Sequence, residues 1–129
     1  MPAHIVVIED DPASLELATY LLIAAGHSVM SASHGVEGIR IAVEHKPDLI
    51  ICDMQLPDLN GFEVRRHLAA RPDWRVVPIV AVTALSMPGD RELALIAGFN
   101  GYLTKPISPE TFLQEIDAFL PAELRSDKA

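Results

Sequence analysis

The sequence predicts a doubly wound α/β fold built on a five-stranded parallel sheet. Short apolar runs, typical of strands buried on both faces, alternate along the chain with segments whose apolar residues recur every three or four positions, as in amphipathic helices. The chain has 129 residues, of which 50% are hydrophobic and 22% charged, a size and composition that suit one globular domain. We therefore expect a single domain over 1–129, with its core at about 4–121 and a frayed polar tail at 122–129.

Charge and composition exclude several classes of partner. The net charge of −8 argues against nucleic acid or an anionic membrane as the main partner, because both would repel the chain. The one cysteine, Cys52, excludes an intramolecular disulfide and is compatible with a reducing compartment. The first residues do not resemble a signal peptide, and no apolar run approaches the ~18 residues that span a bilayer. These features predict a cytoplasmic protein.

The first strand and helix are predicted at the start of the chain. The apolar run His4–Ile8 is typical of a buried strand. Asp11 and Pro12 form a helix start, with a capping carboxylate followed by proline at the first helical position, and Gly26 closes the helix. The apolar stripe of this helix consists of Leu15, Ala18, Leu22 and Ala25.

The second strand and helix follow directly. Residues 28–33 form a more polar run, which we place toward the edge of the sheet. A helix over 36–45 is then stopped by Lys46 and Pro47. Its inner face is predicted to carry Ile39, Ala42 and Val43.

The central strand delivers a carboxylate to the edge of the sheet. Four apolar residues, 49–52, run directly into Asp53. Pro57 and the pair Asn60 and Gly61 then break regular structure, so Asp53 lies at the mouth of a strand-to-helix loop. Functional side chains occupy this position in open parallel sheets.

The second half of the chain continues the alternation. Helices are predicted over 62–70 and 89–97, and strands over 76–82 and 101–104. A last helix is predicted to start at Ser108 and Pro109 and to end before Pro121, with Phe112, Ile116 and Phe119 on its inner stripe.

The remaining polar residues all fall at the carboxyl ends of strands. These residues are Glu9, Asp10, Asp11, Asp53, Thr83 and Lys105. Because the carboxyl ends of parallel strands share one edge, an acidic cluster, a hydroxyl and an ammonium should converge in one crevice. A divalent cation such as Mg²⁺ would relieve the repulsion between the carboxylates. Thr83 and Lys105 could then contact a phosphoryl group that Asp53 accepts as nucleophile.

Four separated motifs resemble the receiver domain of two-component response regulators. They are the strand ending 7–10, the loop containing Asp53, Pro57 and Gly61, the run 82–84, and the run 102–106. The resemblance covers essentially residues 4–121. It implies the flavodoxin-like (βα)5 receiver fold with strand order 2-1-3-4-5.

The resemblance also assigns roles at the site. It implies that Asp53 is the phosphoacceptor and that Thr83 and Lys105 contact the phosphoryl group. The family's metal, Mg²⁺ or Mn²⁺ in its place, would be held by Asp10, Asp53 and the backbone carbonyl of Gln55, with Glu9 acting through water. Asp11 lies one residue past the acidic pair, and we interpret it as the helix cap.

A conformational switch and a cis peptide bond are further features that the resemblance implies. Tyr102 matches the aromatic residue that turns inward when Thr83 moves onto the phosphoryl group, which remodels the face formed by the fourth helix, fifth strand and fifth helix. The bond between Lys105 and Pro106 matches one that is usually cis in the family.

The implied function is that of a phosphoacceptor rather than an enzyme. A sensor histidine kinase or a histidine phosphotransfer protein would supply the phosphoryl group, and a downstream protein would bind the switch face of a monomer or weak dimer. The run 80–90 resembles single-domain DivK-type regulators and receivers of hybrid histidine kinases. With no room for an output domain after Pro121, we expect output through binding; the alternative is a receiver domain excised from a hybrid kinase or larger regulator.

Three rival functions fit the sequence less well. A haloacid-dehalogenase-type phosphatase uses similar residues, but its nucleophile ends the first strand in an Asp-x-Asp motif. A flavodoxin-like FMN protein shares the fold, yet Glu9, Asp10 and Asp11 would repel the FMN phosphate. The third rival is a scaffold that acts without phosphorylation, and the complete set of acidic, Thr and Lys residues argues against it.

Several other residues are expected to be structural. Cys52 is interpreted as a small buried core residue and Trp74 as half-buried. The five histidines lie on separate elements without the spacing of metal ligands, so all are expected to be solvated. They are His4, His27, His34, His45 and His67.

Overall fold

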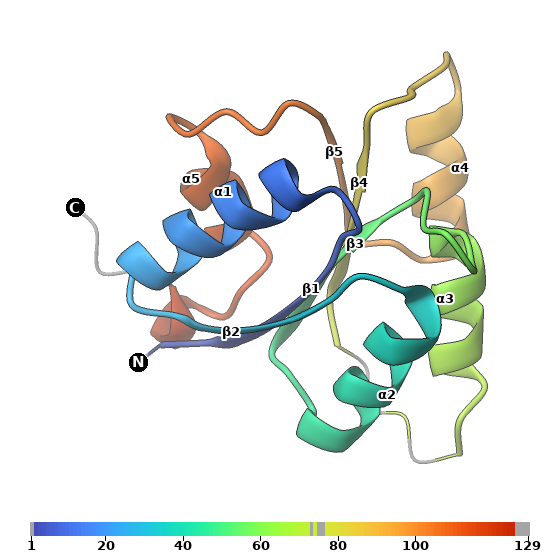
Figure 1. Cartoon of the computed structure of the whole chain (residues 1–129), viewed down its shortest axis with the longest axis horizontal. Coiled ribbons are helices and arrows are strands. Elements are labelled where there is room, and N and C mark those ends of the chain that lie inside the picture. Colours follow the sequence, from blue (N-terminus) through green and yellow to red (C-terminus); the bar gives the residue numbers. More distant parts are fainter. Residues whose placement is uncertain (1, 73, 75–76, 126–129) are drawn as a thin grey trace.

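Five parallel strands form one sheet in the order β2-β1-β3-β4-β5, as predicted (Figure 1). The computed structural model describes residues 2–72, 74 and 77–125. The strands are β1 (His4–Ile8), β2 (Ser28–Ala32), β3 (Leu49–Asp53), β4 (Ile79–Thr83) and β5 (Gly101–Thr104). The helices are α1 (Pro12–Ala24), α2 (Gly35–His45), α3 (Gly61–Ala69), α4 (Asp90–Ala97) and α5 (Phe112–Asp117), followed by the 3-10 turn η1 (Ala122–Leu124).

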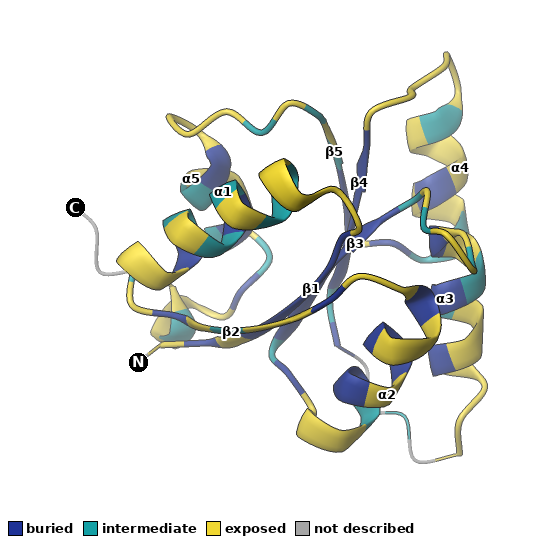
Figure 2. Ribbon diagram, in the orientation of Figure 1, coloured by how far each residue is buried: buried dark blue, intermediate teal, exposed yellow. Residues whose placement is uncertain are grey.

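Helices cover both faces of the sheet and create two apolar cores. Helices α1 and α5 pack on one face, and α2, α3 and α4 pack on the other (Figure 1). Every residue of β3 and β4 is buried, and these central strands are dark in Figure 2. Strands covered on both faces need continuous apolar runs, whereas the edge strand β2 is largely exposed and tolerates polar residues. The double coverage therefore explains the sequence pattern.

The start and end of α1 follow the predicted capping chemistry. The side chain of Asp11 accepts a hydrogen bond of 3.2 Å from the backbone N–H of Ser14, and Pro12 is the first helical residue. Gly26 has φ +97°, a left-handed conformation that glycine adopts readily. Of the predicted stripe, Ala18 and Leu22 are buried, whereas Ala25 lies beyond the helix end.

Other element bounds differ by a few residues. Strand β4 begins at Ile79, later than predicted, and the expected start at position 76 lies outside the described residues. Helix α2 begins one residue early and buries Ile41 as well as Ile39 and Ala42. Helix α3 is shifted by one residue toward the N-terminus, and α4 begins at Asp90.

The predicted start of α5 at Ser108 is wrong. The hydroxyl of Ser108 donates a hydrogen bond of 2.9 Å to Glu110 Oε1 and is not engaged as a cap. Its backbone carbonyl accepts from the N–H groups of Thr111 and Phe112, which makes a turn before the helix begins at Phe112. A cap signature in the sequence therefore marks a turn in the structure.

Of the tail predicted to fray over 122–129, residues 126–129 lie outside the described residues. Residues 122–124 form η1, and the Nε of Arg125 donates to the backbone carbonyls of Asp117 and Leu120 at 2.8 and 3.1 Å. One histidine departs from expectation. His27 was expected to be solvated, yet it is 4% exposed. Its Nδ1 accepts a hydrogen bond of 3.0 Å from the N–H of Ala3, so the imidazole is part of the core beneath β1.

The loop after β3 is tied to the N-terminus of α2. The carboxylate of Asp58 accepts hydrogen bonds of 2.7 and 3.0 Å from the N–H groups of Gly35 and Val36. It therefore supplies the cap that the side chain of His34, the N-cap residue, does not make. The bond from Val36 contributes most to lowering the pKa of Asp58, and the bond from Gly35 adds to it.

None of the helices in the described ranges is long and apolar enough to cross a lipid bilayer. The longest is α1 with 13 residues.

We predict that Asp58→Ala lowers the free energy of unfolding by about 1–2 kcal/mol at neutral pH, because α2 loses its cap. The lowered pKa of Asp58 determines how this loss of stability depends on pH. A carboxylate whose folded pKa is below its ordinary value of 3.8 stabilises the fold above that value and loses this effect as the pH falls through the folded pKa. Urea unfolding of the wild type and Asp58→Ala should therefore show a difference in the free energy of unfolding at neutral pH that disappears in acid.

Glu44→Ala is the matched control for this prediction. Glu44 is an exposed carboxylate on the same helix, paired with exposed Arg40 and 3.8 Å from the Nε2 of exposed His45, so its loss should change stability by less than ~0.5 kcal/mol. If the stability difference between the wild type and Asp58→Ala persists unchanged as the pH falls well below the ordinary pKa of an aspartate, the capping role of Asp58 is contradicted.

Candidate functional site

The carboxyl ends of the strands bring the predicted site residues together. Glu9 follows β1, Asp53 ends β3, Thr83 ends β4 and Lys105 follows β5. Glu9, Asp53 and Thr83 are 5%, 4% and 3% exposed, so these polar side chains are nearly removed from solvent. Buried polar groups need partners, and each of these three has one. The predicted convergence is therefore observed, whereas the chemical roles of the residues stay predictions.

A lysine bridges the two buried carboxylates. The Nζ of Lys105 lies 2.8 Å from Glu9 Oε1 and 3.2 Å from Asp53 Oδ2. The other oxygen of Asp53, Oδ1, accepts a hydrogen bond of 3.0 Å from the backbone N–H of Gln55. The Lys105–Pro106 peptide bond is cis, as expected. Asp53 is thus held at both carboxylate oxygens.

Burial and crowding of charge change the acidity of the groups around Asp53. Burial, followed by hydrogen bonding to Asp53, raises the pKa of Glu9 to about 7, against the opposing effect of Lys105. Burial lowers the pKa of Lys105, but its hydrogen bonds to Glu9 and Asp53 outweigh this effect, so the pKa is raised overall. Burial also raises the pKa of the Cys52 thiol, which agrees with an inert core residue. The crevice therefore contains more negative charge than one ammonium balances.

The acidic residues have the donor set that a hard cation needs. Glu9, Asp10 and Asp53 each offer a carboxylate oxygen, and these atoms lie within 4.8 Å of one another. Asp10 is exposed, unlike the other two, so the cluster opens to solvent on one side. Oxygen ligands, excess negative charge and an open side match the requirements of Mg²⁺, which keeps several of its waters.

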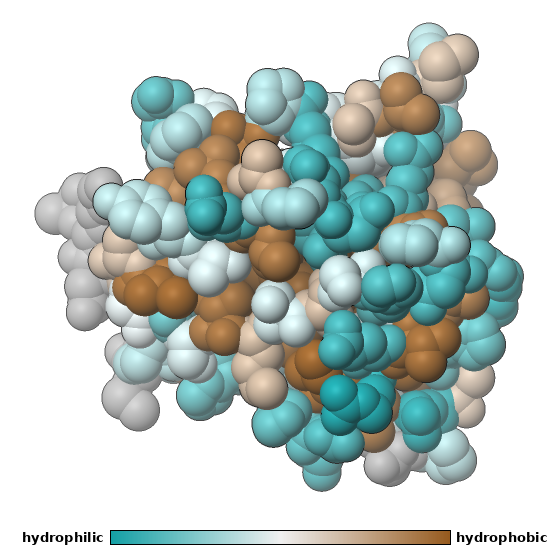
Figure 3. Space-filling view, in the orientation of Figure 1, coloured by the Kyte–Doolittle hydropathy of each residue, from teal (hydrophilic) through white to brown (hydrophobic). Residues whose placement is uncertain are grey.

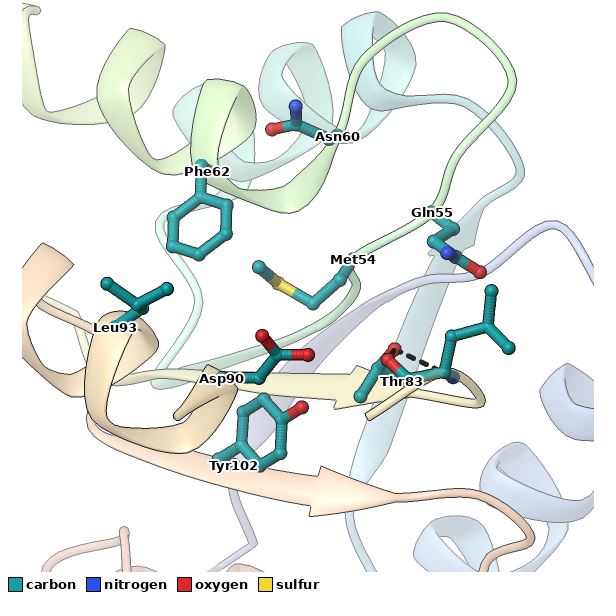
Figure 4. A pocket seen from close by; sticks show the side chains of 9 residues that line it. Met54, Gln55, Asn60, Phe62, Thr83, Asp90, Leu93 and Tyr102 are labelled. Carbon is teal, nitrogen blue, oxygen red and sulfur yellow. Dashed lines mark hydrogen bonds between the residues drawn. The ribbon is translucent and has the colours of Figure 1, made fainter. Parts of the chain in front are cut away.

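The hydroxyl of Thr83 is hydrogen-bonded within its own loop. Its Oγ1 donates a hydrogen bond of 2.9 Å to the backbone carbonyl of Leu85 and accepts one of 3.2 Å from the Leu85 N–H (Figure 4). The hydroxyl is therefore engaged in a local turn. It would have to leave this turn to reach a group bound at Asp53.

Tyr102 faces the same cavity as Thr83. The cavity has a volume of about 290 Å³, and its wall includes Thr83, Tyr102, Met54, Phe62 and Leu93 (Figure 4). Tyr102 is 8% exposed. Its hydroxyl donates a hydrogen bond of 2.9 Å to Ser86 Oγ, in the loop after β4. Thr83 and Tyr102 therefore contact one loop at two points.

Sequence reasoning missed several residues that position the Asp53 loop. Asn60 and Glu63 form a capping box, in which each side chain accepts from the other residue's backbone N–H at 2.9 Å. The spacing of an amide and a glutamate three residues apart could have predicted it. Gly61 packs against Met54, so a side chain there would collide with the residue after Asp53. Only the tertiary structure reveals this contact and the cap from Asp58.

Sequence comparison identifies relatives over nearly the whole chain. The family model described as the response regulator receiver domain matches residues 5–117. The polar-differentiation response regulator DivK of Brucella anthropi is 37% identical over 120 residues, which cover 93% of this chain and 98% of that protein.

Solved structures agree with this relationship. CheY4, the chemotaxis response regulator of Vibrio cholerae, has a TM-score of 0.85 and 27% identity, covering 93% of this chain and 100% of that chain. The receiver domain of the sensor histidine kinase PA1611 of Pseudomonas aeruginosa has a TM-score of 0.81 and 32% identity, covering 92% and 98% of the two chains. That structure contains a magnesium ion coordinated in the active site cleft. Family match, identity and fold together establish that this chain belongs to the response regulator receiver domain family of two-component signalling.

Proposed function

We propose that the chain is a phosphoacceptor response regulator that takes a phosphoryl group on Asp53. The observation that carries this proposal is the buried carboxylate of Asp53 at the end of β3, 3.2 Å from the ammonium of Lys105 and beside Glu9 and Asp10. This arrangement provides one oriented nucleophile with compensating charge next to it. A surface carboxylate would have neither feature.

The chemical step is a displacement at phosphorus. An oxygen of Asp53 forms a P–O bond while the P–N bond to the phosphohistidine of the donor breaks. The electron pair of the broken bond stays on the imidazole nitrogen, which takes up a proton from solvent. The product is an acyl phosphate on Asp53. Water later attacks the phosphorus, the P–O bond to Asp53 breaks, and the signal ends as inorganic phosphate.

The residues of this chain prepare the site for that step. The backbone N–H of Gln55 orients the carboxylate of Asp53 through Oδ1. Lys105, now paired with Glu9 and Asp53, can turn its ammonium to the incoming phosphoryl oxygens. We infer that Glu9, Asp10, Asp53 and the backbone carbonyl of Gln55 would hold Mg²⁺, or Mn²⁺ in its place. When bound, the metal would neutralise negative charge on the phosphoryl group.

We further propose that the modification acts through Thr83 and Tyr102. A phosphoryl group on Asp53 adds acceptor oxygens. The hydroxyl of Thr83 would give up its hydrogen bond to the carbonyl of Leu85 and donate to one of these oxygens instead. That exchange releases the loop which Tyr102 contacts through Ser86. The local charge would therefore alter the surface of α4, β5 and α5.

The surface beside this loop suits a protein target. Large apolar side chains of α4 and the preceding loop are exposed: Leu85 by 66%, Met87 by 69%, Leu93 by 58% and Ile96 by 82%. Exposed apolar side chains gathered on one helix are typical of protein contacts. We propose that a downstream protein binds to this surface. We also propose that a sensor histidine kinase or histidine phosphotransfer protein supplies the phosphoryl group in the cytoplasm, so that the chain works as a DivK-like regulator.

We predict that incubation with Mg²⁺ and acetyl phosphate adds one phosphoryl group, detected by intact-mass spectrometry. The adduct should be sensitive to base, as an acyl phosphate is. Asp53→Asn should abolish it because the amide is a poor nucleophile. Chelation of the metal should reduce it below detection, and unmodified wild-type protein under complete conditions would refute the proposed function. Rapid release of phosphate from many small esters would instead favour a phosphatase.

For the metal, we predict that Asp10→Asn weakens Mg²⁺ binding by about tenfold or more, because a charged ligand is replaced by a neutral one. Backbone amide shifts of residues 9, 53 and 105, followed during a Mg²⁺ titration, measure the affinity. Asp11→Asn is the matched control, since Asp11 is the neighbouring exposed aspartate and caps α1. Equal weakening by the two substitutions would count against a specific role of Asp10.

For the switch, we predict that Thr83→Ala still accepts the phosphoryl group but loses most of the amide shift changes that phosphorylation causes in α4 and β5. Thr83→Ser should restore these changes because it retains the hydroxyl. Thr104→Ala serves as control, since Thr104 is exposed and pairs with Thr83 in the sheet register. Shift changes in Thr83→Ala as large as in the wild type would exclude Thr83 as the link.

A further inference from the structure

A groove between α2 and α3 differs in charge from the rest of the chain. It has a volume of about 470 Å³. Apolar side chains, those of Val36, Ile39 and Leu59, and the basic side chains of Arg40, His67 and Arg71 line it. None of the described residues that line the groove carries a carboxylate. On a chain with a net charge of −8, this is a local reversal of sign.

Three carboxylates of the described residues near the groove have partners of their own. Glu37 accepts a hydrogen bond of 3.3 Å from the backbone N–H of Ser33, and Asp58 caps α2. Glu44 pairs with Arg40 at 3.2 Å, but both side chains are more than half exposed, at 54% and 58%. Exposed pairs of this kind stabilise little, so Arg40 can exchange Glu44 for another carboxylate. The positive rim is therefore accessible to an acidic ligand.

The surface over these helices mixes apolar and polar side chains. In Figure 3, brown and teal residues lie side by side in the lower right, where Figure 1 places α2 and α3. Leu59 forms one wall of the groove and contacts Gly35 at the start of α2. A volume of this size accommodates one or two side chains of a ligand.

We propose that this groove is a docking site for an acidic segment of a partner protein, in which an apolar side chain is flanked by carboxylates. The apolar side chain would lie against Val36, Ile39 and Leu59, and the carboxylates would pair with Arg40 and Arg71. The site is separate from the proposed target face, because α3 lies between α2 and α4 on that side of the sheet (Figure 1). Both surfaces can therefore be occupied at once.

Other anionic occupants fit the groove less well. A bilayer surface is contacted by projecting apolar side chains, whereas these line a hollow, and the net charge of the chain opposes approach to anionic lipid. A small inorganic anion would leave the apolar walls of Ile39 and Leu59 without a partner. A peptide segment satisfies the apolar walls and the basic rim together.

The probe for this proposal is a capped octapeptide in which leucines are separated by pairs of glutamates. Trp74, the one tryptophan of the chain, follows Pro72 closely and packs against the core on this side of the sheet, so its fluorescence reports binding alongside amide shifts. We expect saturable binding that weakens with salt. Arg71→Glu should weaken it about fivefold or more, because an attractive charge pair becomes repulsive.

Controls separate the groove from general charge. Arg66→Glu changes the net charge equally at an exposed position of α3 outside the groove, and it should alter the affinity by less than about twofold. Peptides with glutamine for glutamate, or serine for leucine, should bind more weakly. Equal weakening by Arg66→Glu and Arg71→Glu, equal binding of the glutamine peptide, or the absence of saturable binding would each overturn the proposal.

Two further measurements keep the outcome interpretable. Circular dichroism of Arg40→Glu and Arg71→Glu verifies that both variants are folded, so that loss of binding reports on the groove. Vesicles containing phosphatidylglycerol test a membrane surface as the alternative partner. If they bind the wild type but not Arg71→Glu, and the peptide does not bind, the groove binds a membrane surface and the proposal of a protein partner is overturned. Uptake of phosphoryl from acetyl phosphate is measured on the same variants and should not change, which separates this proposal from that for Asp53.

Discussion

The ammonium of Lys105 between the carboxylates of Glu9 and Asp53 is the interaction on which the site depends. Three strands must end at one edge of the sheet to place the Nζ of Lys105 2.8 Å from Glu9 and 3.2 Å from Asp53. The helices on both faces of the sheet must exclude water from these groups. Two buried carboxylates without a counter-charge would repel each other and pay a large desolvation cost. One ammonium balances only part of this charge, and burial, followed by the hydrogen bond to Asp53, raises the pKa of Glu9 to about 7. The incomplete balance would favour the binding of a further positive charge in the crevice.

The loop that follows Asp53 is restrained at successive points. The Gln55 N–H holds the carboxylate, Asp58 grips the N-terminus of α2, and the capping box of Asn60 and Glu63 begins α3. The chemistry proposed at Asp53 would therefore take place on a fixed scaffold. On the opposite side of the site, the backbone of Thr83 is held in the sheet, but its hydroxyl is hydrogen-bonded within its own loop, to Leu85. In the switch proposed above, a charge change at Asp53 would act on the loop after β4 and not on α2 and α3.

The sequence predicted the fold because its two periods are unambiguous: β3 and β4 are continuous apolar runs, and proline or glycine marks most helix ends. It also predicted which side chains converge, because strand ends share one edge. It failed where a side chain had a choice of partners. The hydroxyl of Ser108 bonds Glu110 instead of capping α5, and His27 is buried against Ala3. The Asp58 cap joins residues 22 and 23 positions apart, a contact that no local pattern encodes.

The distribution of charge constrains how partners can be selected. A chain of net charge −8 with an acidic crevice does not attract an anionic phosphodonor over long distances. Discrimination between donors must therefore come from short-range contact, where apolar side chains and single charges are matched. The described surface offers two such regions of opposite character, the exposed apolar side chains around α4 and the basic groove between α2 and α3. Asp53 ends β3, and the loop that follows it contributes Leu59 to the groove, so a ligand in the groove would bind against the loop that begins at the proposed phosphoacceptor.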